Sequence, residues 1–237
     1  MSFTPSVPDG RTRIKLCGMT RDKDVDAAVA LGVDALGFVF YPPSPRHLSP
    51  DAAARLVARV PPSITTVGLF VDATHDAIDA VLSRVPLSML QFHGDESAAA
   101  CAALQVDFGL PYLKAARVEP GLDLLDFAAR HEGSGVDVAL LLDAFSAGYG
   151  GAGKVFDWSL IPPELRDTAS RRASAPAGAR RVVLSGGLNA ANVADAIARV
   201  RPWAVDTSSG IERAPGVKDP AAMRDFVAAV RADRSRI

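Results

Sequence analysis

Residues 136–143, VDVALLLD, have the pattern of a strand that is buried on both faces and ends in a carboxylate. A glycine-rich loop follows at 148–154, GYGGAGK. Burying an unpaired carboxylate is costly, so its position needs a reason. In α/β proteins, ligands bind at the C-terminal edges of parallel strands, and we therefore expect Asp143 to face a cavity. The alternative is that Asp143 caps the loop with its own side chain.

Composition and charge narrow the protein class. The chain has 237 residues, of which 49% are hydrophobic and 22% charged, as in ordinary globular proteins. A net charge of −1 indicates neither a nucleic-acid nor a membrane partner, and no apolar run is long enough to span a bilayer. No secretory signal is visible, and Cys17 and Cys101 form neither a disulfide framework nor a metal pattern. We expect a cytoplasmic protein.

Apolar strands and amphipathic helices alternate along the chain. Strands are expected at 13–18, 35–40, 65–71, 88–92, 112–116, 136–143, 182–185 and 203–206. Helical segments are expected at 20–31, 50–59, 74–84, 97–104, 122–129, 158–161, 189–200 and 220–232. Eight such units predict a single closed (β/α)8 TIM barrel. A doubly wound open sheet is the rival fold, but no G-x-G-x-x-G motif follows the first strand.

The barrel domain is expected to occupy 13–237. Residues 1–12 contain prolines and no periodicity, which predicts a loose N-terminal tail. Residues 166–180 are polar and predict a flexible surface insertion. Thr20 is expected to cap the first helix, and Ser49, followed by Pro50, to cap the second.

Polar residues follow most of the predicted strands, at the end where a barrel builds its active site. They include Cys17, Arg46, His93 and Asp143, and the loops 185–189 and 206–210. Gly186-Gly187 precede a predicted helix, whose N-terminus would present backbone N–H groups to a phosphate. Ser208, Ser209 and Gly210 follow the eighth strand, and barrels often bind phosphate at these two loops. The alternative is that both loops are plain tight turns.

Two of these side chains have open alternatives. Cys17 is either a small buried hydrophobe or, as a thiolate, a base or nucleophile. Lys15 lies on the same strand face, where it would favour the thiolate or hydrogen-bond elsewhere. His93 is expected in the substrate site or in a structural hydrogen bond. Cys101 lies among alanines and is expected to pack in the core. No cluster of ligands has the spacing of a metal site.

Seven motifs in order resemble the phosphoribosylanthranilate isomerase family over residues 13–230. They are KLCGMT at 15–20, SPR at 44–46, LQFHG at 90–94, LLD at 141–143, GGAGKVFDW at 150–158, SGGLN at 185–189, and DTSSGIE at 206–212 with GVKD at 216–219. The resemblance implies an Amadori rearrangement in tryptophan biosynthesis, from N-(5′-phosphoribosyl)anthranilate to 1-(2-carboxyphenylamino)-1-deoxyribulose 5-phosphate. It implies neither a metal nor an organic cofactor.

The resemblance also implies the site residues. Asp143 matches the general acid that donates a proton to the furanose ring oxygen, and Cys17 matches the base that removes the proton from C2′. Arg46 matches the partner of the anthranilate carboxylate, which suits a guanidinium fork. Gly186, Gly187, Ser208, Ser209 and Gly210 would hold the phosphate. Asp206, an anion near that phosphate, is expected to orient a loop or a substrate hydroxyl.

Beyond its phosphorylated small-molecule substrate, we expect no nucleic-acid or membrane partner, and either a monomer or a homodimer. Another phosphosugar barrel is an alternative within enzymes, but an epimerase would need metal ligands, and indole-glycerol-phosphate synthase would need more catalytic lysines than Lys15. A barrel that binds phosphorylated ligands without turnover is the alternative outside enzymes. The presence of both Cys17 and Asp143 argues against it.

Overall fold

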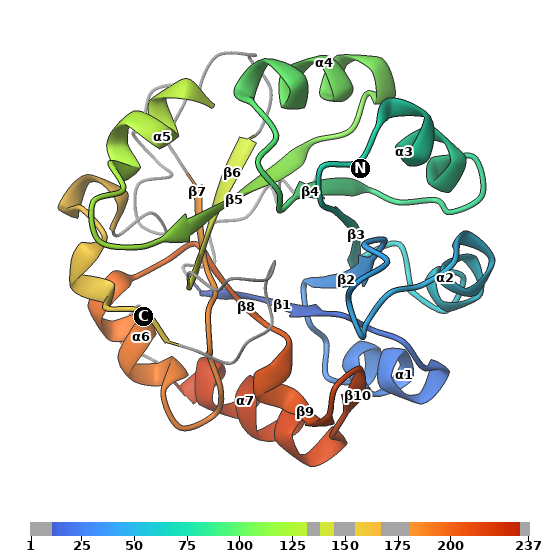
Figure 1. Cartoon of the computed structure of the whole chain (residues 1–237). Coiled ribbons are helices and arrows are strands. Elements are labelled where there is room, and N and C mark those ends of the chain that lie inside the picture. Colours follow the sequence, from blue (N-terminus) through green and yellow to red (C-terminus); the bar gives the residue numbers. More distant parts are fainter. Residues whose placement is uncertain (1–10, 132–137, 145–154, 167–180, 233–237) are drawn as a thin grey trace.

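The computed structural model describes residues 11–131, 138–144, 155–166 and 181–232. Its centre is a closed barrel of parallel strands that follow one another in chain order, with helices around the outside (Figure 1). The strands are β1 (Arg13–Cys17), β2 (Ala35–Val39), β3 (Thr65–Phe70), β4 (Met89–Phe92), β5 (Tyr112–Val118), β6 (Val138–Ala144), β7 (Arg181–Leu184) and β8 (Ala204–Thr207). The predicted (β/α)8 barrel is confirmed, and every predicted strand overlaps an observed one.

The strands bury both faces, because alternate side chains enter two different apolar layers. In β6, Leu140 and Leu142 pack in the outer layer, between the barrel and its helices. Ala139 and Leu141 belong to the inner cluster that fills the barrel, together with residues such as Val67 and Val183. Asp143 continues the inward-facing series of Leu141, so the pleat directs its side chain into the barrel.

Helices cover the outer layer. They are α1 (Asp22–Ala30), α2 (Pro50–Val57), α3 (His75–Leu82), α4 (Ala98–Phe108), α5 (Leu124–Arg130), α6 (Val193–Val200) and α7 (Pro220–Ala232). The side chain of Ser49 accepts a hydrogen bond from the Ala52 N–H, which confirms it as the cap of α2. Between β6 and β7, the described residues form two short 3-10 turns, Trp158–Leu160 and Pro163–Leu165. The first of these is the predicted turn at 158–161.

Two helix starts differ from the predictions. Thr20 does not cap α1: the cap position is Arg21, and the Thr20 hydroxyl donates instead to the Gly216 carbonyl at 2.5 Å. Helix α6 begins at Val193, not near Asn189. The Asn189 and Asn192 side chains form a turn before it, in which the Asn189 N–H donates to Asn192 Oδ1 at 2.9 Å. Asparagine favours such local bonds over helix, so the helix starts later.

A β-hairpin that was not predicted follows β8. A 3-10 turn, Ser209–Ile211, leads into β9 (Glu212–Ala214), which pairs antiparallel with β10 (Val217–Lys218) before α7. The hairpin lies against the loop that follows β2, since a Cβ on Gly216 would meet the Pro45 carbonyl oxygen at 2.7 Å. It therefore carries two charged side chains, Glu212 and Lys218, to the region of Arg46.

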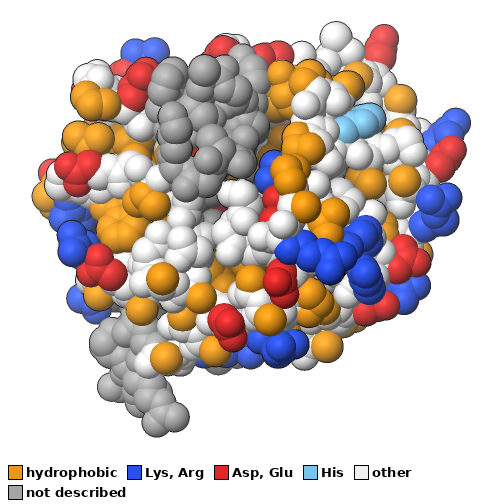
Figure 2. Space-filling model, turned by 60° about the horizontal axis from the view of Figure 1, so that its bottom comes forward, with side chains coloured by type: hydrophobic (Ala, Val, Ile, Leu, Met, Phe, Trp, Pro, Cys, Tyr) orange, Lys and Arg blue, Asp and Glu red, His pale blue; other side chains and the backbone are white. Residues whose placement is uncertain are grey.

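Some predictions lie outside the described residues: most of the 1–12 tail, the glycine loop 148–154 and nearly all of the 166–180 insertion. The boundaries of the 13–237 domain therefore remain a prediction. Among the described residues, no helix is long and apolar enough to cross a membrane. On the face shown in Figure 2, basic and acidic side chains are interspersed with apolar ones, in keeping with the net charge of −1.

Candidate active site

The inward-facing positions near the strand ends carry a layer of polar side chains. Ile14 and Leu16 of β1 pack in the outer layer, so Lys15 and Cys17 face inward. By the same alternation, Gln91 and His93 follow the inward Met89, and Asp206 follows the inward Ala204. All of these residues are buried, and the predicted catalytic pair, Cys17 and Asp143, belongs to this layer.

Cys17 lies at the end of β1 in a small apolar cluster with Val39, Leu69 and Val71. Gly37, its register partner on β2, makes room for the thiol, because a Cβ there would lie 2.6 Å from the Cys17 Sγ. Burial raises the pKa of the Cys17 thiol above its ordinary value, Lys15 lowers it in part, and Asp206 raises it further. The surroundings of Cys17 thus act on its ionisation in both directions.

Lys15 and Asp206 form a buried ion pair beside this thiol. The Lys15 Nζ donates to Asp206 Oδ1 at 2.9 Å, and both side chains are almost fully buried. The Ser185 hydroxyl of the loop after β7 donates to Asp206 Oδ2 at 3.3 Å. Burial lowers the pKa of Lys15, but Asp206 and Cys17 raise it more, so it ends above its ordinary value and Lys15 is a cation. Asp206 therefore has two protein partners.

Asp143 lies at the end of a chain of polar contacts. Its Oδ1 accepts from the Ala144 N–H at 3.0 Å, and its Oδ2 lies 3.1 Å from the His93 Nε2. The other ring nitrogen of His93, Nδ1, lies 2.9 Å from the Gln91 Nε2. Gly186 stands against the carboxylate, since a Cβ there would lie 3.2 Å from Asp143 Oδ1 and 2.6 Å from the Ala144 nitrogen. Both predicted residues, His93 and Gly186, thus contact or abut Asp143.

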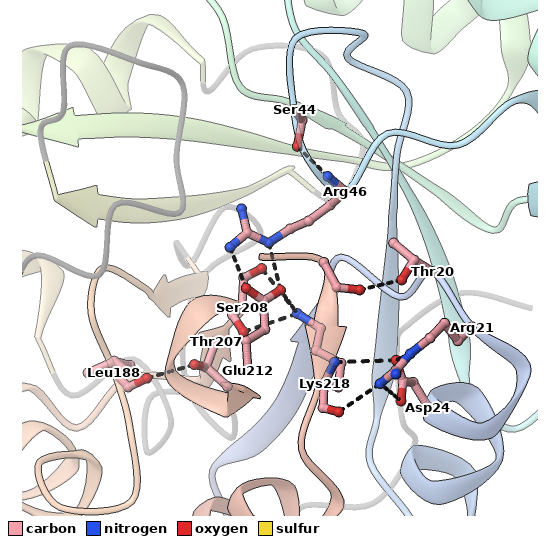
Figure 3. Close-up of polar contacts among 11 residues, drawn as sticks. Thr20, Arg21, Asp24, Ser44, Arg46, Leu188, Thr207, Ser208, Glu212 and Lys218 are labelled. Atoms are coloured by element: carbon pink, nitrogen blue, oxygen red, sulfur yellow. Dashed lines mark hydrogen bonds and ion pairs between the residues drawn. The ribbon is translucent and has the colours of Figure 1, made fainter. Parts of the chain in front are cut away.

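Arg46 is paired with an acidic side chain, Glu212. Its Nε and Nη2 donate to Glu212 Oε1 and Oε2 at 2.8 and 2.7 Å, which makes a two-point fork on the hairpin (Figure 3). Its stem crosses Gly18, where a Cβ would lie 2.5 Å from the Arg46 Cδ. Gly18 has φ +78°, a conformation that glycine adopts without strain. Gly18, the residue after Cys17, therefore leaves the space in which the Arg46 side chain lies.

The predicted phosphate loops have open backbone donors, although one reason for the prediction was wrong. Because α6 starts at Val193, Gly186-Gly187 do not lie at a helix N-terminus. Among the described residues, however, no hydrogen bond is found from the N–H groups of Gly186, Gly187 and Ser208. Gly210 has its own packing reason, since a Cβ there would overlap the Leu188 carbonyl oxygen at 1.9 Å.

Gln91, Glu212 and Lys218 are site residues that sequence reasoning did not single out. Glu212 and Lys218 lie within the quoted motifs 206–212 and 216–219, so the signal was present without an assigned role. Burial raises the pKa of Glu212, but Arg46 and Lys218 lower it below its ordinary value overall. Burial lowers the pKa of Lys218, which Glu212 only partly offsets. The described residues contain no group of three or more His, Cys, Asp or Glu able to hold a metal ion.

A family model and the similar known proteins point to the same family. A family model described as N-(5′-phosphoribosyl)anthranilate (PRA) isomerase matches residues 14–229. The N-(5′-phosphoribosyl)anthranilate isomerase of Ralstonia nicotianae is 56% identical over 225 residues, covering 95% of each chain. That of Dechloromonas aromatica is 55% identical over 227 residues, covering 95% of this chain and 99% of its own.

Solved structures agree. The phosphoribosyl anthranilate isomerase of Thermotoga maritima superimposes with a TM-score of 0.79 at 38% identity, covering 93% of this chain and 99% of its own. A crystal structure of such an isomerase in complex with reduced 1-(o-carboxyphenylamino)-1-deoxyribulose 5-phosphate gives a TM-score of 0.76 at 36% identity, with the same coverage.

Proposed function

The chain belongs to the N-(5′-phosphoribosyl)anthranilate isomerase family, and from this premise we propose that Cys17 is the general base and Asp143 the general acid of its reaction. The chain is an aldose–ketose isomerase of tryptophan biosynthesis. It rearranges N-(5′-phosphoribosyl)anthranilate to 1-(2-carboxyphenylamino)-1-deoxyribulose 5-phosphate. The observation that carries the residue assignment is the placement of a thiol and a carboxylate, both buried, in one inward-facing layer of strand ends.

Asp143 opens the sugar ring. It gives a proton to the furanose oxygen, the bond from C1′ to that oxygen breaks, and the electron pair on the anthranilate nitrogen forms a Schiff base with C1′. His93 supports this step, because its Nε2 at 3.1 Å fixes the direction of the Asp143 carboxyl group. Gln91 in turn fixes the ring of His93 through Nδ1. We assign His93 to orienting the acid as well as lining the substrate site.

Cys17 completes the isomerisation. As the thiolate, its Sγ takes the proton from C2′, and the electrons of that C–H bond form the C1′=C2′ double bond of an enolamine while the Schiff-base nitrogen becomes neutral. Tautomerisation then gives the ketone at C2′. Lys15 lies two residues away on the same face of β1 and lowers the pKa of the thiol, which favours the form that the base requires. Asp206 opposes this effect, because its negative charge raises the pKa of the thiol.

The two ends of the substrate meet different loops. We assign the phosphate to the loops after β7 and β8, where Gly186, Gly187, Ser208, Ser209 and Gly210 offer backbone N–H groups and hydroxyls. The Ser208 Oγ already accepts from the Lys218 Nζ at 3.3 Å, which leaves its hydrogen to donate. We assign the carboxylate of the aromatic ring to Arg46, a residue that lies over Gly18, directly after the base.

Assembly and location are proposals of the same kind. A structure from Thermotoga maritima is described as monomers of a dimeric isomerase, and for this chain we propose a monomer or a homodimer. A cytoplasmic location rests on the biosynthetic role and on two cysteines that are both free thiols.

A fluorescence assay tests the proposal. Phosphoribosylanthranilate is generated in situ, enzyme is added in the presence of EDTA, and the loss of anthranilate-type fluorescence is followed. We expect rapid decay that EDTA does not change. Cys17→Ser and Asp143→Asn should each lower kcat by about 100-fold or more. Both variants should still bind reduced 1-(2-carboxyphenylamino)-1-deoxyribulose 5-phosphate, the product analogue whose keto group has been reduced. Arg46→Ala should chiefly raise KM. A fully active Cys17→Ser enzyme would contradict the assignment of the base.

A further inference from the structure

The Arg46 guanidinium is held by an acidic partner that lies far away in the sequence. Glu212 accepts from the Arg46 Nε and Nη2 at 2.8 and 2.7 Å, and the two side chains are 9% and 5% exposed. A two-point fork of this kind fixes the plane and direction of a guanidinium, whereas a single contact leaves it able to rotate. Glu212 therefore determines which way Arg46 faces.

Lys218 holds Glu212 in turn. Its Nζ donates to Glu212 Oε1 at 2.8 Å, to the Ser208 carbonyl at 3.0 Å and to the Ser208 Oγ at 3.3 Å, so each ammonium hydrogen has an oxygen. The Lys218 side chain is fully buried. If Glu212 swung away, it would leave a buried ammonium without its counter-charge, which is strongly unfavourable. The hairpin strands β9 and β10 carry both residues, and their pairing keeps them together.

One edge of Arg46 is left for another partner. A guanidinium has a side edge, made by Nε and one terminal nitrogen, and an end edge that includes the other terminal nitrogen. Glu212 occupies the side edge. No hydrogen bond is found from Nη1 to any described residue, and Figure 3 shows this nitrogen pointing away from Glu212. Arg46, Glu212 and Lys218 together carry one uncompensated positive charge, which suits one carboxylate.

We propose that Glu212, braced by Lys218, is a positioning residue that turns the Nη1 edge of Arg46 toward the carboxylate on the substrate's aromatic ring and so sets the enzyme's selectivity for that carboxylate. This inference rests on the proposed function, in which Arg46 binds the carboxylate. Glu212 touches no substrate atom in this role. We therefore expect Glu212 to change the affinity for ligands that have the carboxylate, and to leave the affinity for ligands that lack it nearly unchanged.

Two matched ligands measure that difference. One is 1-(2-carboxyphenylamino)-1-deoxyribitol 5-phosphate, and the other is its analogue with an unsubstituted phenyl ring. Titration calorimetry gives the Kd of each with the full-length enzyme, and the ratio of the two constants is the selectivity. We expect Glu212→Gln to reduce this ratio by about tenfold, the scale of one hydrogen bond to a charged group, while the Kd of the phenyl analogue stays near that of the unchanged enzyme.

Four further variants separate the outcomes. Arg46→Ala should abolish the selectivity, and adding Glu212→Gln to it should change the ratio no further. Glu96→Gln is the matched control, because Glu96 also pairs with a buried lysine, Lys114, at 2.7 Å but does not contact Arg46. It should leave the ratio unchanged. If Glu212→Gln unfolds the hairpin, Glu212→Asp keeps the charge for Lys218 but is one methylene too short for the fork, and should lower the ratio as well.

The result that would contradict the proposed function differs from the result that would contradict only the role of Glu212. If Arg46→Ala leaves the selectivity intact, the carboxylate site of the proposed function is wrong, and the role of Glu212 falls with it. If Arg46→Ala abolishes selectivity but folded Glu212→Gln and Glu212→Asp both keep it, or weaken both ligands equally, Glu212 only holds the hairpin. In that case the inference is overturned while the proposed function stands.

Discussion

A thiol is a base only as the thiolate, and the neighbours of Cys17 oppose one another in this respect. Burial raises the pKa of Cys17, Lys15 lowers it, and Asp206 raises it. The ion pair of Lys15 and Asp206, 2.9 Å apart, therefore moderates the effect of the lysine on the thiol. The value of kcat/KM, which reports the free enzyme, should rise with pH as Cys17 ionises above neutrality.

Two variants should move that rise in opposite directions. Lys15→Met removes a nearby positive charge and should shift the increase in kcat/KM to higher pH. Asp206→Asn removes a nearby negative charge and should shift it to lower pH. At a pH well below the pKa of the thiol, lowering that pKa by about one raises the thiolate fraction about tenfold. The pH profile of kcat/KM reports the free enzyme, and the rate of Cys17 alkylation, read by mass spectrometry, checks the assignment.

Cys101 provides an internal comparison for the alkylation. Burial raises the pKa of Cys101 to about 11, and neither Lys15 nor Asp206 is among the groups that act on it, so its alkylation rate should be the same in both variants. Lys15→Met leaves Asp206 without its buried partner, and Asp206→Asn does the same to Lys15, so the thermal stability of both variants is measured as well. Shifts of the same sign in both variants would show that general loosening, rather than charge, governs the thiol.

At the scale of single elements, β2 leaves space for the Cys17 thiol because Gly37 has no side chain. Gly37 lies opposite Cys17 in the β1–β2 register, and a Cβ there would lie 2.6 Å from the Sγ. Gly37→Ala should displace the thiol and lower kcat by about 10- to 100-fold, because catalysis is sensitive to misplacement on the ångström scale. Steady-state kinetics with the fluorescence assay measures this effect.

Gly68 on β3 is the matched control for Gly37. A Cβ on Gly68 would meet the end of the Leu87 side chain at 2.4 Å, which is crowding in the outer layer and away from Cys17. Gly68→Ala should cost about 1–3 kcal/mol of stability, as overpacking does, with kcat close to that of the unchanged enzyme. A similar loss of kcat in both variants would mean that the strands, and not the thiol, had been disturbed.

The hairpin β9–β10 marks the limit of what the sequence predicts about elements. Strands that are apolar on both faces have an unmistakable pattern, so β1 to β8 and the polar residues at their ends were predictable. The hairpin is short and polar, and it has no periodicity. Its key contact joins Arg46 to Glu212 across 166 positions, a distance that no local pattern reports. The motifs contained both residues, but only the fold brings them together.

Thr20 shows the same limit at a helix start. A threonine before a helix is a common cap, and the local sequence supports that interpretation. In the folded chain, its hydroxyl instead donates to the carbonyl of Gly216, a residue of the hairpin turn. Two neighbouring contacts also tie the start of α1 to β10. Arg21 donates to the Lys218 carbonyl at 2.7 Å, and the Lys218 N–H donates to Oδ2 of the buried Asp24 at 3.4 Å. Tertiary contacts here outweigh local preference.

For the whole molecule, His131 makes the stability depend on pH. Burial, aided by the charges of Lys114 and Arg130, lowers the pKa of His131 to about 4. Its Nδ1 is buried and has no hydrogen-bond partner among the described residues, so protonation there is unfavourable. Between about pH 6.5 and 4, the unfolded chain binds a proton at this position that the folded chain does not. Stability should therefore fall as the pH drops through this window.

Substitution isolates the contribution of His131. The unchanged enzyme should lose about 1–2 kcal/mol through this group between pH 7 and 4.5, a figure reduced for partial solvent screening. His131→Leu should show a shallower decline over the same range. Urea unfolding at a series of pH values measures both. Equal slopes for the two proteins would show that other groups carry the acid sensitivity.

Asp143 and Cys17 act on separate steps of the reaction, since Asp143 opens the sugar ring and Cys17 removes the C2′ proton. Substrate deuterated at C2′ tests this assignment directly, because only the second step breaks that bond. Cys17→Ser should make proton removal rate-limiting and give a clear primary isotope effect on kcat. Asp143→Asn should make ring opening rate-limiting and give an isotope effect near one. A large effect in Asp143→Asn with none in Cys17→Ser, or equal effects in both, would contradict the account.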